Sequence, residues 1–167
     1  MKFKKVRQYD CDVEKAVEFF IEKELGYDLT NLENVTTFKR VKREDDGAIR
    51  NDVEEWCAHA QLPPALRAVI PPKALTWYQH AKWVRATKTL TFRIEPIILK
   101  GKVDCTGRTI FSSAGQGKYA RDFEVEIVVK LPLIASLAEN VIVDLLKKNE
   151  QQEHELVLKT IDRIKQS

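Results

Sequence analysis

Three polar residues sit at positions where strand alternation predicts buried side chains. Arg121 and Tyr119 share the apolar parity of residues 117–130, and Gln79 shares that of residues 74–84. A guanidinium suits a carboxylate or phosphate group, because its planar fork binds two oxygens at once. Arg121 is therefore a candidate anchor for an anionic ligand. The alternative is an arginine that reaches solvent or pairs with a structural glutamate.

Aromatic residues would supply the apolar part of such a site. Trp77 and Trp83 alternate on one face of residues 74–84, whereas the face of Trp56 is ambiguous. Aromatic walls with a few polar groups are usual in ligand cavities, although the same rings also pack ordinary cores. The predicted ligand-binding set is Trp77, Gln79, Trp83, Phe92, Phe111, Tyr119, Arg121, Phe123, Leu137, Val141 and Leu145.

The other chemistry-bearing residues follow no catalytic or metal-binding pattern. His59, His80 and His154 are scattered, with no HxxxH or HExxH spacing, and the three cysteines are far apart with no CxxC. The stretch "SAGQGK" lacks the spacing of a phosphate-binding loop and is typical of a hairpin turn. We predict no catalytic residue, no metal, no cofactor and reduced cysteines.

Length and charge restrict the class of protein. The chain has 167 residues, a length that predicts one domain over residues 1–167. Its net charge of +3 gives little support for a nucleic-acid partner. The basic start lacks the apolar core of an export signal, and the longest apolar run is too short to span a bilayer. We expect a cytoplasmic protein. The basic segments "MKFKKVR" and "KRVKRED" fit protected edge strands, and transient contact with a membrane surface stays open.

The elements that must position these residues can be read from periodicity. Residues 3–10 predict an edge strand, Asp12 can cap a helix that starts at Val13, and Gly26 can end it. Six further strands, joined by short turns that favour an antiparallel meander, are predicted at residues 34–43, 48–60, 74–84, 88–97, 101–112 and 117–130. In "QLPPALRAVIPP", two Pro-Pro pairs bracket a short helix that could act as a lid.

A long closing helix is predicted over residues 133–166. Its apolar stripe, Leu133, Leu137, Val141, Leu145 and Leu156, should be buried on the inner face of the sheet. The polar stretch "KKNEQQEHE" interrupts the stripe, so we expect the last turns to overhang. The predicted fold class is α+β, a curved antiparallel sheet of about seven strands that grips a C-terminal helix, with short helices between the first two strands.

This order of elements resembles the START-like superfamily, also called helix-grip, polyketide cyclase-like or SRPBCC. The resemblance rests on "LPPALRAVIPP", the Trp77 and Trp83 strand, "GKVDCTGRTIF" and the Lys130-Leu131-Pro132 junction, and it points to an uncharacterised bacterial family of that superfamily. It implies a cavity between sheet and helix. Members of the superfamily bind lipids, sterols or aromatic polyketides, some are cyclases, and others bind proteins.

Three functional hypotheses follow from the sequence. The first is a carrier or sensor that binds a hydrophobic small molecule or lipid in that cavity. The second is an enzyme of the cyclase or hydrolase kind that uses Arg121, Tyr119 or a histidine to polarise a carbonyl. The third is a protein-interaction module that uses the overhanging helix. The oligomeric state stays open.

Overall fold

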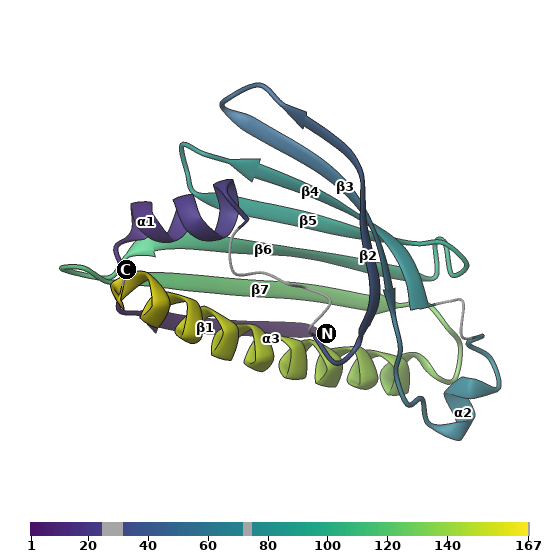
Figure 1. Ribbon diagram of the computed structural model, residues 1–167. Coiled ribbons are helices and arrows are strands. Elements are labelled where there is room, and N and C mark those ends of the chain that lie inside the picture. Colours follow the sequence, from purple (N-terminus) through teal and green to yellow (C-terminus); the bar gives the residue numbers. More distant parts are fainter. Residues whose placement is uncertain (25–31, 72–74, 167) are drawn as a thin grey trace.

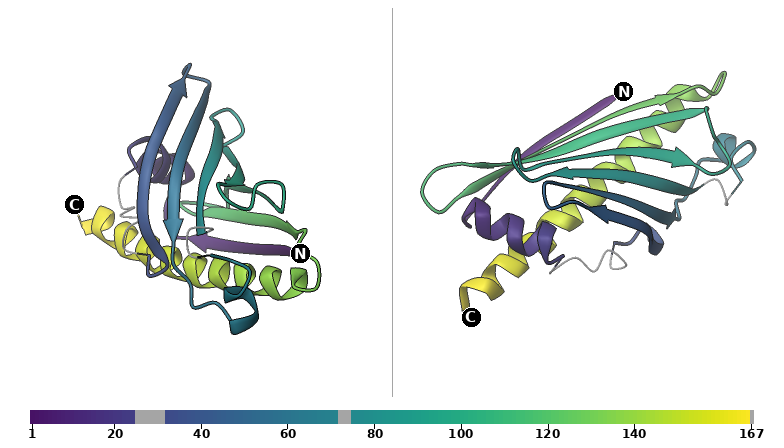
Figure 2. Two further views of the ribbon diagram at one scale, coloured as in Figure 1. Left: turned by 90° about the vertical axis from the view of Figure 1, so that its right-hand side faces the viewer. Right: turned by 90° about the horizontal axis from the view of Figure 1, so that it is seen from above.

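The computed structural model describes residues 1–24, 32–71 and 75–166. Seven antiparallel strands in the order β1-β7-β6-β5-β4-β3-β2 curve around one long helix, α3 (Figures 1 and 2). The strands are β1 (Lys2–Tyr9), β2 (Val35–Asp45), β3 (Ile49–Ala58), β4 (Thr76–Val84), β5 (Thr89–Pro96), β6 (Val103–Ser113) and β7 (Tyr119–Val129). The helices are α1 (Val13–Val17), the π-helix η1 (Glu18–Glu22), α2 (Pro64–Arg67) and α3 (Ala135–Gln166). The predicted α+β helix-grip architecture is confirmed.

Strands β2 to β7 form an antiparallel meander, and β1 lies at the edge of the sheet beside the last strand, β7. Strands β2 to β7 each pair with the next in sequence, and β1 pairs with β7 in a register that runs from Lys2 opposite Glu126 to Tyr9 opposite Tyr119. The two edge strands, β1 and β2, are the lysine- and arginine-rich segments. Charged side chains on an edge oppose pairing with another chain.

Local signals set the first elements as predicted. The Asp12 side chain accepts hydrogen bonds from the backbone N–H groups of Glu14 and Lys15, which caps α1. The β2–β3 turn contains Gly47 at φ 86°, and Asp46 Oδ1 accepts from the N–H of Ile49 at 2.7 Å. The expected helix stop at Gly26 lies outside the described residues.

The buried face of α3 differs from the predicted stripe. The helix begins at Ala135 rather than at residue 133, so Leu133 precedes it, fully exposed. Leu137 is 37% exposed. The residues of α3 that are buried are Ala138, Val143, Glu150, Val157 and Ile161. The prediction that Leu133 and Leu137 are buried was therefore wrong.

The buried face of α3 differs from the predicted apolar stripe because the helix faces charged partners from the sheet as well as apolar ones. Arg7 on β1 donates to both carboxylate oxygens of Glu150, at 3.0 Å each. Arg121 on β7 pairs with Glu153. Both glutamates belong to the polar stretch that appeared to interrupt the apolar stripe. An inward face that contains paired carboxylates cannot be recognised from apolar periodicity alone.

The last turns of α3 do not overhang as expected. Val157 and Ile161 are 1% and 3% exposed, and they belong to a buried cluster with residues of α1, η1, β4, β6 and β7. The sheet thus contacts α3 in both halves, through β1 and β7, and α1 and η1 join the buried cluster at its C-terminal end (Figure 1). No helix of residues 1–24, 32–71 or 75–166 combines the length and the apolar character that a bilayer crossing requires.

The buried charge pair between β1 and α3 gives a stability prediction. Arg7→Met leaves Glu150, whose side chain is 6% exposed, without its counter-charge, and we expect a loss of about 3 kcal/mol in the free energy of unfolding. Arg7→Met/Glu150→Met removes both charges and should recover most of that loss. Urea unfolding measures both.

A matched control lies on the same strand. Lys4→Met breaks an exposed pair with Asp122, with N and O atoms 3.0 Å apart, and should cost less than about 1 kcal/mol. A double variant as unstable as Arg7→Met would contradict a role for charge pairing in holding α3.

Candidate functional site

A cavity of about 200 Å³ lies under the N-terminal half of α3. Its walls come from the inner face of the sheet, from α2 with its flanking residues, and from α3. The apolar lining residues are Ala58, Ala60, Leu62, Leu66, Ile70, Leu75, Ile94, Pro96, Leu99, Val103, Val129, Leu131, Ala138, Val141, Ile142, Leu145 and Leu146. Beside them, Trp77, Asn34, Asn149 and Cys105 complete the lining.

The proline-bracketed segment forms one wall because its short helix has a single apolar side. Pro64 occupies the first turn of α2, where its missing N–H removes no helical hydrogen bond. Leu66, 1% exposed, and Ile70, 8% exposed, point from this segment into the cluster under α3. The segment that the sequence marks as a lid therefore covers the cavity.

The polar groups of the lining are few and neutral. Asn34 Nδ2 donates to Asn149 Oδ1 at 3.1 Å, which joins the start of the sheet to α3. The ring of Trp77 lies parallel to that of Trp56, with centroids 6.4 Å apart. The Trp77 Nε1–H group is buried and has no hydrogen-bond partner in the described part of the chain. A buried donor without an acceptor is costly, so this group needs explanation.

The pKa of the Cys105 thiol shows how favourable the cavity wall is for a negative charge. Its side chain is buried on β6, and burial alone raises the pKa of the thiol to about 12. An adjacent cation would have lowered the pKa by stabilising the thiolate. The cavity wall at Cys105 is therefore a poor environment for an anion.

Of the predicted ligand-binding residues, Trp77, Val141 and Leu145 line this cavity. The others take different places. Trp83, Phe111 and Tyr119 belong to the buried cluster at the other end of the sheet, under α1 and η1. Leu137 faces solvent.

Phe92 packs over a glycine and against Phe123 instead of lining the cavity, and it also borders a hollow on the outer face of the sheet. Their rings are stacked with centroids 6.3 Å apart. Phe92 occupies the space above Gly107, where an added Cβ would come within 2.3 Å of the ring. Gly107 is thus required by the close approach of this ring, and Phe92 acts as part of the core.

Arg121 and Gln79 each have a partner away from the cavity. Arg121 is 6% exposed, pairs with Glu153 of α3 and lies 5.9 Å from the centre of the Phe123 ring. Gln79 donates to Glu54 at 3.4 Å. The arrangement at Arg121 corresponds to the structural alternative that the sequence left open, an arginine that pairs with a glutamate.

A charged cluster on the inner faces of β2 and β3 has no separate signal in the sequence. Arg43 donates to both carboxylate oxygens of Asp52, at 2.6 and 2.9 Å, and Arg50 donates to the carbonyl of Ile21 at 3.0 Å. Burial raises the pKa of the neighbouring Glu54 carboxyl. These groups hold β3 against η1, which is a structural role.

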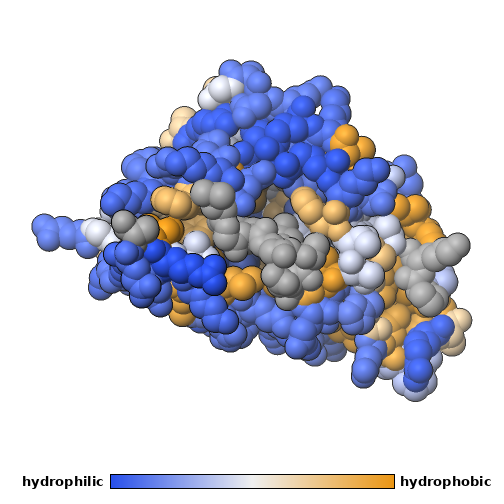
Figure 3. All heavy atoms as spheres, viewed as in Figure 1, coloured by the Kyte–Doolittle hydropathy of each residue, from blue (hydrophilic) through white to orange (hydrophobic). Residues whose placement is uncertain are grey.

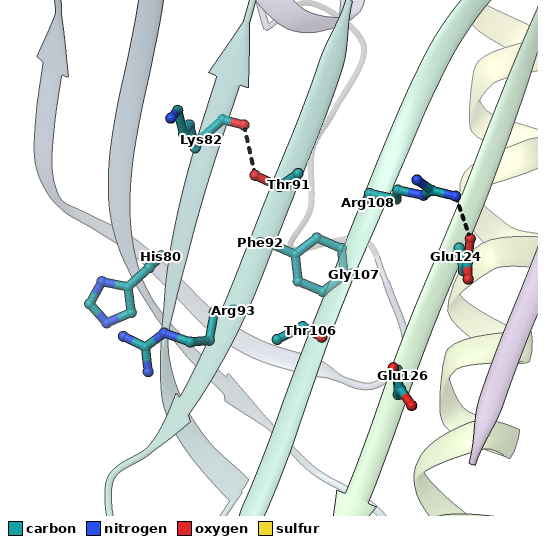
Figure 4. Close-up of a pocket in the computed structure, with 10 residues that line it drawn as sticks. All are labelled: His80, Lys82, Thr91, Phe92, Arg93, Thr106, Gly107, Arg108, Glu124 and Glu126. Carbon is teal, nitrogen blue, oxygen red and sulfur yellow. Dashed lines mark hydrogen bonds and ion pairs between the residues drawn. The ribbon is translucent and has the colours of Figure 1, made fainter.

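The outer face of the sheet has a shallow hollow of about 410 Å³ (Figure 4). Small residues, including Thr91 and Gly107, form its floor, and charged side chains stand around it. Arg108 pairs with Glu124 at 2.9 Å across its edge. With cations and carboxylates neutralising one another in an open hollow, it offers a weaker case for a ligand than the more sheltered apolar cavity.

Exposed apolar side chains surround the end of the molecule that holds the cavity. We define the apolar rim as Val69, Ile97, Ile98, Leu133 and Leu137, which are 53%, 44%, 46%, 105% and 37% exposed. Each lies close in the chain to a lining residue, and hydrophobic surface gathers at this end, over α2 and the neighbouring loops (Figure 3). Leu133 also has φ 68°, which is unfavourable for a leucine. Leu133 thus combines full exposure with an unfavourable backbone conformation.

Some lining residues that were not predicted carry a signal in the sequence, and others carry none. Leu62, Leu66 and Ile70 stand in the proline-bracketed segment, which the sequence marks as a lid. Asn34 and Asn149 are ordinary amides in polar surroundings. Nothing in their spacing signals that they meet across the cavity.

Cys105 yields a prediction on pH. The unfolded thiol ionises near its ordinary pKa of 9.0, whereas the folded thiol keeps its proton to about 12. Between these values the folded state binds more protons, so the contribution of Cys105 to stability falls as pH rises, by about 1 kcal/mol per pH unit. Urea unfolding from pH 8 upward should show a shallower decline for Cys105→Ala than for the wild type.

Cys57→Ala is the control, because it removes a thiol that is only half-buried, on β3, and so separates the effect of burial from the loss of a thiol. If Cys105→Ala declined as steeply as the wild type, the low polarity of the cavity wall would be refuted.

Comparison with known proteins supports the fold. A family model described as "Protein of unknown function (DUF2505)" matches residues 5–161, and a search of curated proteins finds no match. The structure of TTHA0849 from Thermus thermophilus is similar, with a TM-score of 0.67 and 15% identity over 95% of each chain. The Zhui aromatase/cyclase from Streptomyces sp. R1128 has a TM-score of 0.68 and 11% identity over 98% of this chain and 94% of that one.

A START superfamily protein from Mycobacterium smegmatis is similar over 98% of both chains, with a TM-score of 0.56 and 9% identity. At these identities the structures establish the fold, and the family model establishes membership. The chain belongs to the DUF2505 family, an uncharacterised family, and it has the helix-grip fold of the START superfamily, as its sequence predicted.

Proposed function

We propose that this protein binds a small hydrophobic molecule in the cavity between the sheet and α3, as a carrier or sensor. The observation that carries the proposal is the partly open space of about 200 Å³ with an almost wholly apolar lining. Apolar cavities of about 150 Å³ bind benzene or xenon, so this one suits a two-ring system or a short alkyl segment. A larger lipid would fit with part of the molecule outside.

The comparisons favour the same class of ligand. The Streptomyces relative is named an aromatase/cyclase, and a further relative is the norcoclaurine synthase from Thalictrum flavum; both are named for chemistry on small organic molecules. We propose binding rather than catalysis by Arg121 and Tyr119, because neither residue lines the cavity. Arg121 is held by Glu153, and Tyr119 is 1% exposed in the opposite cluster.

Filling the cavity tests the proposal. Val141→Phe places a ring in the space between α3 and the sheet, and we expect it to weaken the binding of prodan, an uncharged naphthalene dye, by at least about tenfold. Stability should change by less than about 1 kcal/mol, because the ring enters existing space instead of a packed core. Dye fluorescence measures binding, and native mass spectrometry after bacterial expression detects a retained ligand.

Leu158→Phe is the matched control, on the same helix, 42% exposed and away from the cavity and the rim. It should bind prodan like the wild type. A wild-type protein that binds neither prodan nor any cellular ligand would refute the proposed function.

The apolar rim favours a second partner, an anionic lipid surface from which a ligand could be taken up. Basic residues stand among the rim residues in the sequence: Arg67, Lys100, Lys102 and Lys130. Lys100 and Lys130 pair with Glu95 and Asp104, while Arg67 and Lys102 form no ion pair with described residues. Apolar side chains with unneutralised cations suit the interface of an anionic bilayer.

Vesicle binding tests this partner. We expect the protein to sediment with phosphatidylserine-containing vesicles more than with phosphatidylcholine vesicles, and less as salt increases. Ile98→Ser/Leu133→Ser should reduce sedimentation several-fold. Val41→Ser removes an apolar side chain on edge strand β2 that is 52% exposed, similar to Ile98, and should not reduce sedimentation. Equal loss in both variants, or self-association through the rim, would contradict a lipid surface.

A further inference from the structure

The polar groups of the cavity point to the chemical class of its ligand. We propose that the cavity selects an uncharged, mainly hydrocarbon molecule with one oxygen acceptor, such as a ketone or ester carbonyl, which receives the Trp77 Nε1–H group. This inference rests on the proposed function and adds a ligand class to it. It differs from the sequence-based expectation of an anionic ligand anchored by Arg121.

The described lining of the cavity carries no charged side chain. Among the described residues that line the cavity there is no Asp, Glu, Lys, Arg or His. The guanidinium expected to face a ligand, that of Arg121, pairs with Glu153 instead. An ionised ligand would therefore lose its hydration in the cavity without gaining a counter-charge.

Cys105 supplies independent support from within the wall. Burial alone raises the pKa of its thiol, so the surroundings disfavour a negative charge at that point. A carboxylate placed in the same space meets the same penalty. A neutral carbonyl does not.

The indole N–H group of Trp77 is a buried hydrogen-bond donor in the cavity wall. Trp77 lines the cavity, and its Nε1–H group is buried without an acceptor in the described part of the chain. The neighbouring Trp56 differs, because its Nε1 donates to Glu54 at 3.1 Å. An oxygen of the ligand would complete the hydrogen bonding of Trp77.

Asn34 and Asn149 add a fixed polar element to the same wall. Asn34 is 8% exposed, and its amide donates to Asn149 across the cavity boundary. The hydrogen bond orients the Asn34 amide toward Asn149, so the polar groups in this part of the wall are neutral as well.

Three naphthalenes of nearly equal shape test the proposal on the wild-type protein. They are 2-acetylnaphthalene, which has a carbonyl, 2-ethylnaphthalene, which has no acceptor, and 2-naphthoate, which is anionic. We expect the ketone to bind roughly threefold to tenfold more tightly than the hydrocarbon, the usual net effect of one hydrogen bond. At pH 7 the carboxylate should bind at least about a hundredfold more weakly than the ketone. Titration calorimetry measures all three.

Two tryptophan variants assign the effect. Trp77→Phe keeps an aromatic wall but removes the N–H donor, so the preference for the ketone should disappear while hydrocarbon binding persists. Trp56→Phe is the matched control, from the other ring of the stacked pair, and should keep the preference. An NMR measurement on the wild-type protein does not depend on whether a variant folds. The Trp77 indole N–H signal should move downfield with the ketone and not with the hydrocarbon.

The outcomes separate the inference from the proposed function. If the carboxylate bound as tightly as the ketone, or if Trp77→Phe kept the preference, the inference would be overturned and hydrophobic binding would stand. If none of the three naphthalenes bound the wild type, the proposed function itself would fail, and the inference with it.

Discussion

The long helix is held against the sheet in two different ways along its length, and the cavity depends on that difference. In its C-terminal half, Arg7 and Arg121 reach Glu150 and Glu153, and Val157 and Ile161 enter a packed cluster. A buried carboxylate that lost its partner would be strongly unfavourable, so these contacts fix the position of the helix. In its N-terminal half, α3 forms the roof of a space that side chains do not fill.

This division separates the packed end of the molecule from the end that we propose binds a ligand. Most of the large aromatic residues of the packed end, including Trp83, Tyr119 and Phe111, are fully committed to contacts with one another or with α1 and η1. The open end is lined by aliphatic residues from the proline-bracketed segment, the loops and α3. Changes in ligand size at the open end can therefore be tolerated without loosening the charge pairs. The apolar rim lies at the same end, where a hydrophobic molecule would arrive.

The sequence predicted the fold well because alternation and turns are local signals. Strand parity placed Trp77 and Arg121 on the inner face, and Asp12 and Gly47 marked a cap and a turn at their observed positions. Parity does not tell which part of an inner face is packed and which is open. That depends on where α3 crosses, and the crossing is set by Glu150 and Glu153, which look like surface residues in the sequence. Asn34 and Asn149, 115 positions apart, meet only through the tertiary fold.

The proposed function depends on the apolar cavity under the N-terminal half of α3. A crystal structure determined under xenon pressure tests it most directly, because xenon occupies apolar cavities of this size and leaves packed cores empty. We expect xenon density between Trp77 and Val141, with α3 unmoved. A cavity filled by ordered water, or α3 collapsed onto the sheet with no xenon bound, would contradict it.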